Sequence, residues 1–495
     1  MKRLAGLDAA FLSAETENWP AHVACITIFD PAKAGREFDL DVLKRSLASR
    51  LDLLPPLRWR VIEAPLGLGH PHWIEDPGFD LDWHIRRMGI AKPGGKRELA
   101  AAAQDIYRHR LDRRRPLWEL WVLDHLADGK VALLWKIHHA CIDGMAGAGM
   151  QEVMFDASPD YQPPDHLEPD AWIPEAVPDP TQLLISSIPA AAAAQVRAGR
   201  EIIRVLGRIG EVVRSMGSAM PHNVPRTRFN QPLGQRRAWG FVSLSLSDLK
   251  SVKNAFGVKL NDVFVAAVSG GIRSYLERRG ELPEHSLIAS IPVNARADDS
   301  PSTGNAISGM TATLGTDLED SVARLRAIHA STMASKEMQR AMGAQMLMSL
   351  ADTPPPAMFS LAARFYGKTQ LVKRLPPMFN VVISNVPGPR EPLYSQGAPV
   401  EAFHSMGIVY DGAGLFIGAM SYLDQMDVGI LADPDALDDP FELADGISNE
   451  LAHLVVRARE ELASQKTPRP AREAEPIAKG PVARSKQKSA TRRST

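Results

Sequence analysis

The chain has 495 residues, enough for two or three domains, and its 45% hydrophobic and 23% charged residues are typical of a soluble globular protein. Its two cysteines, Cys25 and Cys141, stand far apart in the sequence, which argues against a disulfide framework and a cysteine metal site and favours a reducing compartment. The net charge of −1, without a basic module interleaved with aromatic residues, argues against a nucleic-acid partner.

The sequence has no segment typical of a membrane span or a signal peptide. No window approaches the ~18 uncharged apolar residues that a span needs. Acidic residues interrupt the start of the chain, "MKRLAGLDAAFLSAETENWP", before any long apolar core develops. We therefore expect a cytoplasmic location.

The first part of the chain alternates strand and helix patterns. Strands are predicted at 22–29, 117–126 and 130–139, and helices at 39–51, 97–111 and 144–155. Asp39 can cap the first of these helices. Asp128 and Gly129 form a turn that makes the second and third strands neighbours.

The middle of the chain has a different amino-acid composition. Residues 158–180 are rich in proline and acidic side chains, which predicts an extended surface linker. Residues 194–217 predict an amphipathic helix with an apolar face and many arginines. Such a helix can lie in a membrane interface, or it can pack on the protein with its arginines in water.

A second alternating block follows. Strands are predicted at 237–246, 286–296, 379–384, 401–410, 414–422 and 426–432, and helices at 247–257, 261–280 and from Asp439 onward. Ser247 is expected to cap the first helix and Gly257 to end it, Asn261 opens the second, and Asp439 caps the last. We divide the chain into an N-terminal lobe (1–157), a middle segment (158–235), a C-terminal lobe (236–465) and a tail (466–495).

The tail is basic. It contains nine Lys/Arg and two Asp/Glu, a net charge of +7, which leaves −8 for the first 465 residues. Its Pro, Ser, Thr and Ala content without aromatic residues predicts disorder. The tail either solubilises the chain or attracts it to an anionic lipid surface.

The stretch "LLWKIHHACIDGMAG" (133–147) holds the residues with the clearest chemical potential. Adjacent side chains of a strand face opposite ways, so His138 and His139 cannot bind one metal ion from the same face, and no third ligand is nearby. One histidine should face a reaction space and the other the packing behind it. Asp143 can cap the next helix, pair with a cation or hold the loop, and Gly144 removes a side chain at a close approach.

The motif "HHACIDG" resembles the HHxxxDG motif of CoA-dependent acyltransferases, and further segments narrow the resemblance to the bacterial wax ester synthase/diacylglycerol acyltransferase family. The N-terminal "LAGLDAAFLSAETENWPAHVACITIFDP" is similar to the start of that family. The same holds for a Pro-Leu-Trp element (Pro116, Leu117, Trp118), an Asn-Asp element (Asn261, Asp262) and the segments "SIPVNAR…STGN" and "NVVISNVPGP". These matches run in order from Leu4 to Leu462 and leave out the tail.

The resemblance implies an α/β fold of two chloramphenicol-acetyltransferase-like lobes, joined by a long crossover, with a substrate tunnel between them. It implies that His139 is the general base, with His138 supporting and Asp143 structural or orienting. Long-chain acyl-CoA enters as a co-substrate, and no cofactor or metal is expected. The acceptor is diacylglycerol or a long-chain alcohol, met at a membrane or lipid-droplet surface.

Several other residues have two interpretations each. Pro116, Leu117 and Trp118 either line the tunnel or anchor strand packing. Asn261 either contacts the acceptor or oxyanion or caps its helix. Arg296 either pairs with Asp143 across the lobes or is a surface arginine. Cys141 is assigned to packing, because direct transfer through His139 needs no acyl-enzyme.

The sequence therefore predicts an acyl-CoA:alcohol O-acyltransferase that makes triacylglycerol, with wax esters as an additional product. Two alternatives stay open. One is a condensation-type acyltransferase with other donors or acceptors, and the other is a lipid-droplet-binding paralogue with little activity. Acyl chain length, acceptor preference and oligomeric state are left open.

Overall fold

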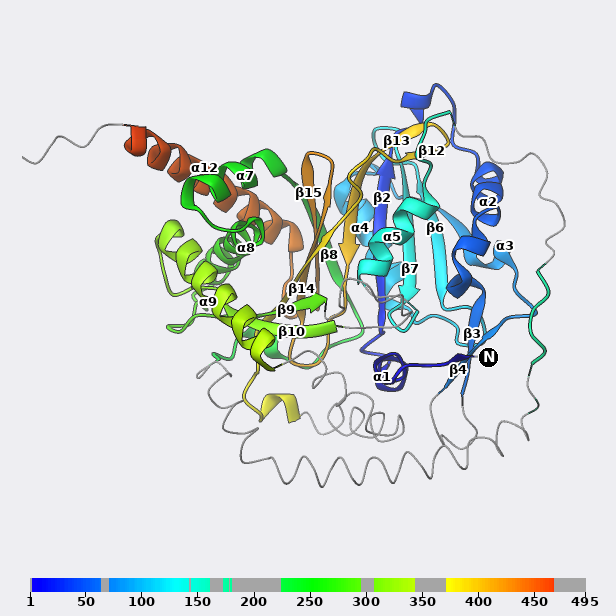
Figure 1. The fold of residues 1–495 in the computed structure, drawn as a ribbon, viewed down its shortest axis with the longest axis horizontal. Coiled ribbons are helices and arrows are strands. Elements are labelled where there is room, and N and C mark those ends of the chain that lie inside the picture. Colours follow the sequence, from blue (N-terminus) through cyan, green and yellow to red (C-terminus); the bar gives the residue numbers. More distant parts are fainter. Residues whose placement is uncertain are drawn as a thin grey trace, which may run out of the picture.

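Two six-stranded sheets, each with helices packed against it, make up the described part of the molecule (Figure 1). The computed structural model describes residues 2–63, 71–141, 144–160, 172–177, 179, 224–294, 307–342 and 371–466. The predicted helix at 194–217, almost all of the tail, Asp143 and Arg296 lie outside these residues.

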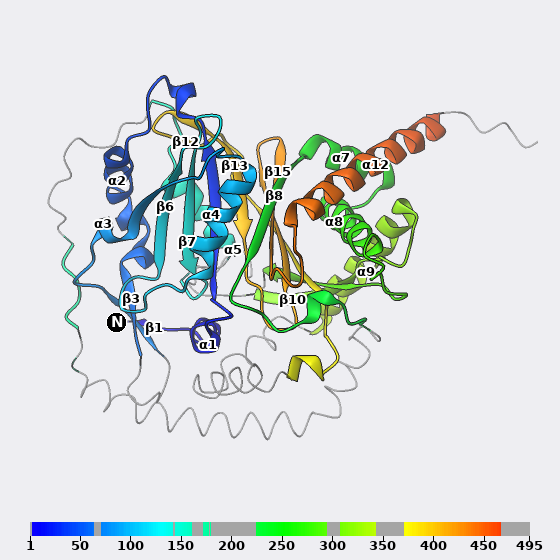
Figure 2. The ribbon, with the colours of Figure 1, turned by 180° about the vertical axis from the view of Figure 1, so that it is seen from behind.

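The first sheet has the strand order β12-β13-β2-β7-β6-β5. Its strands are β2 (His22–Phe29), β5 (Ile85–Gly89), β6 (Trp118–Asp124), β7 (Val131–His138), β12 (Tyr394–Ser395) and β13 (Ala398–Met406). Two helices cover opposite faces: α5 (Gly144–Met154) lies in front of the sheet in Figure 1, and α4 (Lys96–Arg108) lies in front of it in Figure 2. This sheet therefore has two buried faces, and β7 is buried along its whole length.

Smaller elements surround this sheet. Helices α1 (Gly6–Ala14), α2 (Leu40–Ala48) and α3 (Leu81–His84) belong to the same lobe, as does a three-stranded sheet of β1 (Lys2–Arg3), β4 (His72–Glu75) and β3 (Trp59–Ile62). Asp39 caps α2 as predicted, since its carboxylate accepts the backbone N–H groups of Asp41 and Val42.

The second sheet has the order β10-β9-β11-β14-β15-β8. Its strands are β8 (Ala238–Ser245), β9 (Ile288–Asn294), β10 (Ile307–Thr313), β11 (Val381–Pro387), β14 (Leu415–Tyr422) and β15 (Gln425–Ala432). Helices α7 (Leu246–Phe256), α8 (Leu260–Glu277), α9 (Ser321–Met342) and α12 (Pro440–Lys466) accompany it. The middle of α8 is fully buried and forms the centre of this lobe's core.

The two lobes are not the separate sequence segments that we expected. The strand predicted at 401–410 forms as β13, but it pairs antiparallel with β2 of the first sheet instead of joining the C-terminal sheet. β13 also contacts the second lobe, because the carboxylate of Asp427 on β15 accepts the backbone N–H of Phe403 at 2.8 Å. A strand from the C-terminal half of the sequence therefore belongs to the first sheet, and it joins the two lobes.

Two of the predicted helix starts are wrong in detail. Ser245, not Ser247, caps α7, because its hydroxyl accepts the N–H of Asp248. Asn261 does not cap α8, since the carboxylate of Asp262 takes the N–H of Lys259 at 3.1 Å instead. Gly257 ends α7 in the left-handed conformation, as predicted, with φ of 66°.

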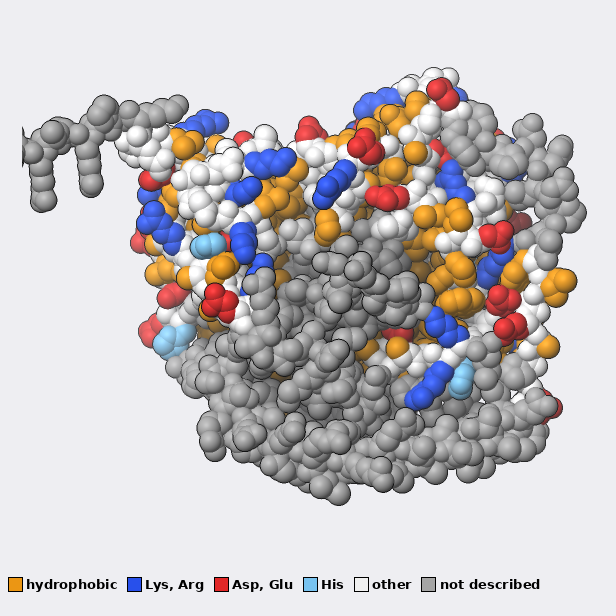
Figure 3. Space-filling view, viewed as in Figure 1, with side chains coloured by type: hydrophobic (Ala, Val, Ile, Leu, Met, Phe, Trp, Pro, Cys, Tyr) orange, Lys and Arg blue, Asp and Glu red, His pale blue; other side chains and the backbone are white. Residues whose placement is uncertain are grey.

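Among the described residues, no single helix has the length and apolarity to cross a membrane; α7 and α8 reach both only when taken together, with a 105° bend between them. The described part of the face in Figure 3 mixes apolar side chains with both signs of charge.

Candidate active site

The paired histidines stand at the carboxyl end of β7. Alternation along the strand places His138 on the same face as Lys136, whose ammonium group donates to the carbonyl of Ile106 in α4 at 3.0 Å. Ile137 faces the other way and packs in the same core cluster as Met150 of α5. His138 therefore faces the α4 side, and His139 follows it in the turn that leaves the strand.

His138 is enclosed by protein. It is 1% exposed, and its Nδ1 accepts the backbone N–H of Ala140 at 3.1 Å. Burial lowers the pKa of His138 well below its usual value, and the nearby charge of Arg113 lowers it further. The ring is therefore neutral, with its proton on Nε2, 3.8 Å from Oε1 of Glu15. His138 thus has a packing and positioning role.

Glu15 is a site residue that the sequence analysis missed. Its side chain is 2% exposed and pairs with Arg113 at 2.9 Å. It also accepts the backbone N–H of Ala21 at 3.3 Å. The partners lie 98 residues apart in the sequence, so no local spacing could reveal them. The carboxylate joins α1, the start of β2 and the loop before β6 beside the histidines.

His139 is more open than its neighbour. Its side chain is partly exposed, and its ring stacks on Phe11 of α1 with 4.4 Å between centroids. The backbone N–H of His139 donates to the carbonyl of Ala21 at 2.9 Å, which fixes the turn out of β7. Helix α5 begins at Gly144, the last residue of the motif. A partly open imidazole held by its backbone is suited to take and return a proton.

Cys141 closes the same turn. Its backbone N–H donates to the carbonyl of His138 at 2.9 Å, and its half-buried thiol packs beside core residues of the N-terminal lobe. Burial raises the pKa of the Cys141 thiol, and the charge of Asp8 raises it further. Burial likewise raises the pKa of Cys25 to about 12. Neither thiol is poised as a thiolate nucleophile at neutral pH.

The Pro-Leu-Trp element is packed inside the lobe. Pro116 is buried, Leu117 is 0% exposed and Trp118 is 1% exposed. The indole N–H of Trp118 donates to the carbonyl of Leu57 at 2.7 Å, and the ring stacks on His84 and Trp135. The packing interpretation therefore accounts for the position of these residues, and no described contact makes them walls of a tunnel.

The two residues of the Asn-Asp element make different contacts. Asp262 is 1% exposed and accepts the hydroxyl of Thr332 at 2.8 Å and Nδ1 of His329 at 2.5 Å, which ties α8 to α9. Asn261 is half-buried, and its Oδ1 accepts from Nδ2 of Asn385 at 3.2 Å. Asn385 lies on β11, a strand that contacts α5. Asn261 is thereby held near the boundary between the lobes.

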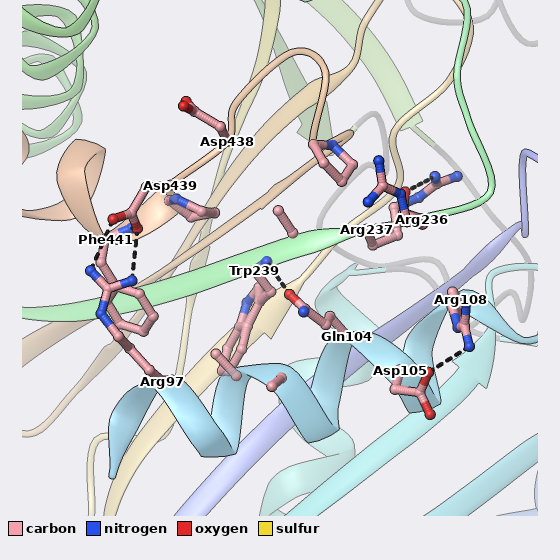
Figure 4. Close-up of a pocket in the computed structure, with 15 residues that line it drawn as sticks. Arg97, Gln104, Asp105, Arg108, Arg236, Arg237, Trp239, Asp438, Asp439 and Phe441 are labelled. Atoms are coloured by element: carbon pink, nitrogen blue, oxygen red, sulfur yellow. Dashed lines mark hydrogen bonds and ion pairs between the residues drawn. The ribbon is translucent and has the colours of Figure 1, made fainter.

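A pocket of about 430 Å³ lies elsewhere between the lobes, among α4, the start of β8 and the start of α12 (Figure 4). Arg97 of α4 pairs with Asp439 across it at 2.9 Å, and Gln104 accepts the backbone N–H of Trp239. Neither histidine of the motif lines this pocket, which lies on the α4 side of the first sheet. We therefore assign it no part in the reaction. Among the described residues, no group of three His, Cys, Asp or Glu side chains could hold a metal ion.

Comparison with known proteins matches nearly the whole chain. The model of the wax ester synthase/diacylglycerol acyltransferase catalytic domain matches residues 4–264, and that of the C-terminal domain matches 303–455. A Mycobacterium tuberculosis protein named "Putative diacylglycerol O-acyltransferase" is 32% identical over 465 residues, which cover 92% of this chain and 90% of the relative. A second such protein is 33% identical over 479 residues, covering 95% and 99%.

Comparison with solved structures finds the same family. The wax ester synthase/diacylglycerol acyltransferase from Marinobacter aquaeolei VT8 is 28% identical, with a TM-score of 0.67 over 93% of this chain and 100% of that one. The trichothecene 15-O-acetyltransferase from Fusarium sporotrichioides shares the fold at 13% identity, with a TM-score of 0.58 over 92% and 94%. The starter condensation domain of rhizomide synthetase does so at 15% identity, with a TM-score of 0.54 over the same shares.

Proposed function

We propose that this chain, which belongs to the wax ester synthase/diacylglycerol acyltransferase family, transfers a long-chain acyl group from acyl-CoA to the hydroxyl of diacylglycerol, with long-chain alcohols as second acceptors. The observation that carries the proposal is the unequal pair at the end of β7. His138 is enclosed and neutral, whereas His139, in the turn that follows the strand, is partly exposed.

The reaction needs a base for a weak nucleophile. His139 takes the proton of the acceptor hydroxyl while the oxygen attacks the thioester carbonyl. A C–O bond forms, the C–S bond breaks, and the leaving CoA thiolate recovers the proton from the imidazolium of His139. Donor and acceptor meet directly, so no acyl group passes through Cys141.

The developing oxyanion needs a hydrogen-bond donor. Asn385 holds the oxygen of the Asn261 carboxamide, which leaves the NH₂ group of Asn261 as the end that can donate. Asn261 therefore contacts the oxyanion or the acceptor hydroxyl in this proposal. Asp143, which lies outside the described residues, and Gly144 keep in this proposal the supporting role that the family resemblance implies.

The protein collects its water-insoluble acceptor at the inner face of the cell membrane or at lipid droplets, without a spanning helix. The arginine-rich segment 194–217 and the +7 tail support this part of the proposal through their sequence alone.

Product analysis tests the proposal. Purified protein is incubated with radiolabelled oleoyl-CoA and either dioleoylglycerol or hexadecanol, dispersed in detergent, and the products are separated by thin-layer chromatography. A reaction without acceptor measures plain thioester hydrolysis. We expect labelled triacylglycerol above that background and wax ester as the second product. Label in neither product would reject the proposal, and transfer only from a pantetheine-bound donor would favour a condensation-type enzyme.

A further inference from the structure

An exposed loop joins apolar and basic side chains at one end of the molecule. Residues 372–378, here the docking loop, begin within the short helical turn Leu371–Lys373, which is drawn in yellow in Figures 1 and 2, and continue beyond it. Leu375 is 49% exposed and Met378 is 62% exposed. Lys373 and Arg374 between them are exposed as well. Large apolar side chains presented together with cations are unusual on a surface that faces only water.

The backbone of the docking loop is held in place. Val372 at its start is 5% exposed, and Arg226 donates to its carbonyl at 2.9 Å and also to the carbonyl of Leu375. Beyond its end, the buried side chain of Asn380 accepts the backbone N–H of Ile288 and donates to the carbonyl of Pro225. The exposure of Leu375 and Met378 is therefore imposed by an anchored backbone.

No described carboxylate forms an ion pair with the charges of the loop. Within the part of the chain that the structure describes, Lys373, Arg374 and Arg226 form no ion pair with a carboxylate. Other exposed arginines do form such pairs, for example Arg114 with Asp112 and Arg457 with Asp320. Three cations thus surround an apolar tip, a combination that complements an anionic lipid interface.

Aromatic rings connect the residue that follows the docking loop with the segment between α1 and β2, next to the histidines. Phe379 meets Tyr410 edge-on at 6.0 Å, and Tyr410 meets Trp19 in the same way at 6.2 Å. Trp19 lies in the connection from α1 to β2, which also supplies the Ala21 carbonyl that holds His139. A lipid surface under the loop would therefore lie on the side of the molecule that holds this connection, next to the turn of His139.

We propose that residues 372–378 dock the protein on an anionic lipid surface, with Leu375 and Met378 inserted among the lipids and Lys373 and Arg374 at the headgroups. The inference rests on the proposed function, because only an enzyme with a water-insoluble acceptor needs to take its substrate from such a surface. It adds a docking element to the segments suggested by the sequence.

Sedimentation of the full-length protein with sucrose-loaded vesicles tests the inference. Vesicles of phosphatidylcholine with phosphatidylglycerol are compared with phosphatidylcholine alone. We expect Lys373→Gln/Arg374→Gln to weaken binding to anionic vesicles about five-fold per charge, and this deficit should vanish at 1 M salt, where charges are screened within ~3 Å. Leu375→Ser/Met378→Ser should weaken binding about ten-fold or more at every salt concentration.

Matched variants outside the loop serve as controls. Lys250→Gln/Arg459→Gln removes the same two charge types, and Leu53→Ser removes another exposed leucine; all three positions lie on other elements. These variants should sediment like the unchanged protein. Loop variants that sediment like the controls would overturn the inference. Acyl transfer in detergent should be equal in all variants, and its absence from the unchanged protein would reject the proposed function while leaving the docking result standing.

Discussion

At the scale of single residues, the site depends on the different surroundings of two neighbouring imidazoles. His138 is buried, and its Nδ1 accepts a hydrogen bond from the backbone N–H of Ala140. His139 keeps partial exposure and is positioned through its backbone and by Phe11. Burial therefore keeps the His138 ring neutral, and we propose that the partly exposed His139 ring exchanges a proton with the substrate.

Cys141 provides the first prediction at this scale. Burial raises the pKa of its thiol, so the thiolate needed for attack on a thioester is scarce at neutral pH. Cys141→Ala should keep most of the transfer activity, and mass spectrometry of the unchanged protein with acyl-CoA alone should find no acylated Cys141. An acyl group trapped on this thiol would mean that transfer proceeds in two covalent steps.

At the scale of elements, β13 is the strand that joins the lobes. It pairs with β2 on one side and packs against β15 on the other. Gly429 of β15 permits this approach, since a Cβ atom at that position would lie 1.8 Å from the carbonyl oxygen of Ser405. At this point of the contact, β13 can approach β15 only because residue 429 has no side chain.

Gly429→Ala should therefore destabilise the protein by about 3 kcal/mol or more, because the clash is with backbone and cannot be relieved by a rotamer change. Denaturation by urea measures the effect. Gly149→Ala in α5 is the matched control, since a Cβ there meets nothing within 4 Å. The control should be neutral or more stable by about 0.5–1 kcal/mol, as for Gly→Ala in a helix. Equal stability of the two variants would contradict the packing described for β13.

Local signals predicted most elements. The strand at 22–29 forms with the predicted bounds, and Asp39, Gly257 and Asp439 act at the helix ends where their side chains or conformations suggested. These signals act over three or four residues and can be read directly from a sequence.

What the sequence did not predict depends on contacts between distant segments. The pairing of β13 with β2 joins residues more than 350 positions apart, and Glu15 pairs with Arg113 across 98 positions. Asn261 was expected to open α8 because its residue type suits a cap, but the helix starts one residue earlier, with Lys259 as the N-cap residue and the Asp262 carboxylate accepting the Lys259 N–H.

At the scale of the whole molecule, buried histidines make folding sensitive to acid. Burial lowers the pKa of His84 to about 4 and of His404 to about 3, and it lowers that of His22 and His138 as well. In the unfolded chain these groups titrate near ~6.5. The unfolded state therefore binds more protons below that pH, so stability is complete above ~6.5 and is lost as the pH falls toward 4, by up to ~1.4 kcal/mol per pH unit for each histidine.

The melting temperature should consequently fall between pH 7 and pH 5. His84→Gln should make this fall shallower, because it removes one of the groups that take up a proton on unfolding. His453→Asn is the control, since His453 is exposed and its removal should leave the slope unchanged. Equal slopes in both variants would show that the buried rings do not govern the acid response.

The most direct test of the account compares His139→Ala with His138→Ala in the transfer of radiolabelled oleoyl-CoA to dioleoylglycerol in detergent, with a melting curve for each. We predict that His139→Ala lowers the rate by about 10²–10⁴-fold, the usual share of a general base, with the melting temperature unchanged. His138→Ala should keep partial activity and melt at a lower temperature, because a buried, hydrogen-bonded ring is removed. The reverse pattern, with His138→Ala inactive at an unchanged melting temperature and His139→Ala active, would contradict the assignment of the base.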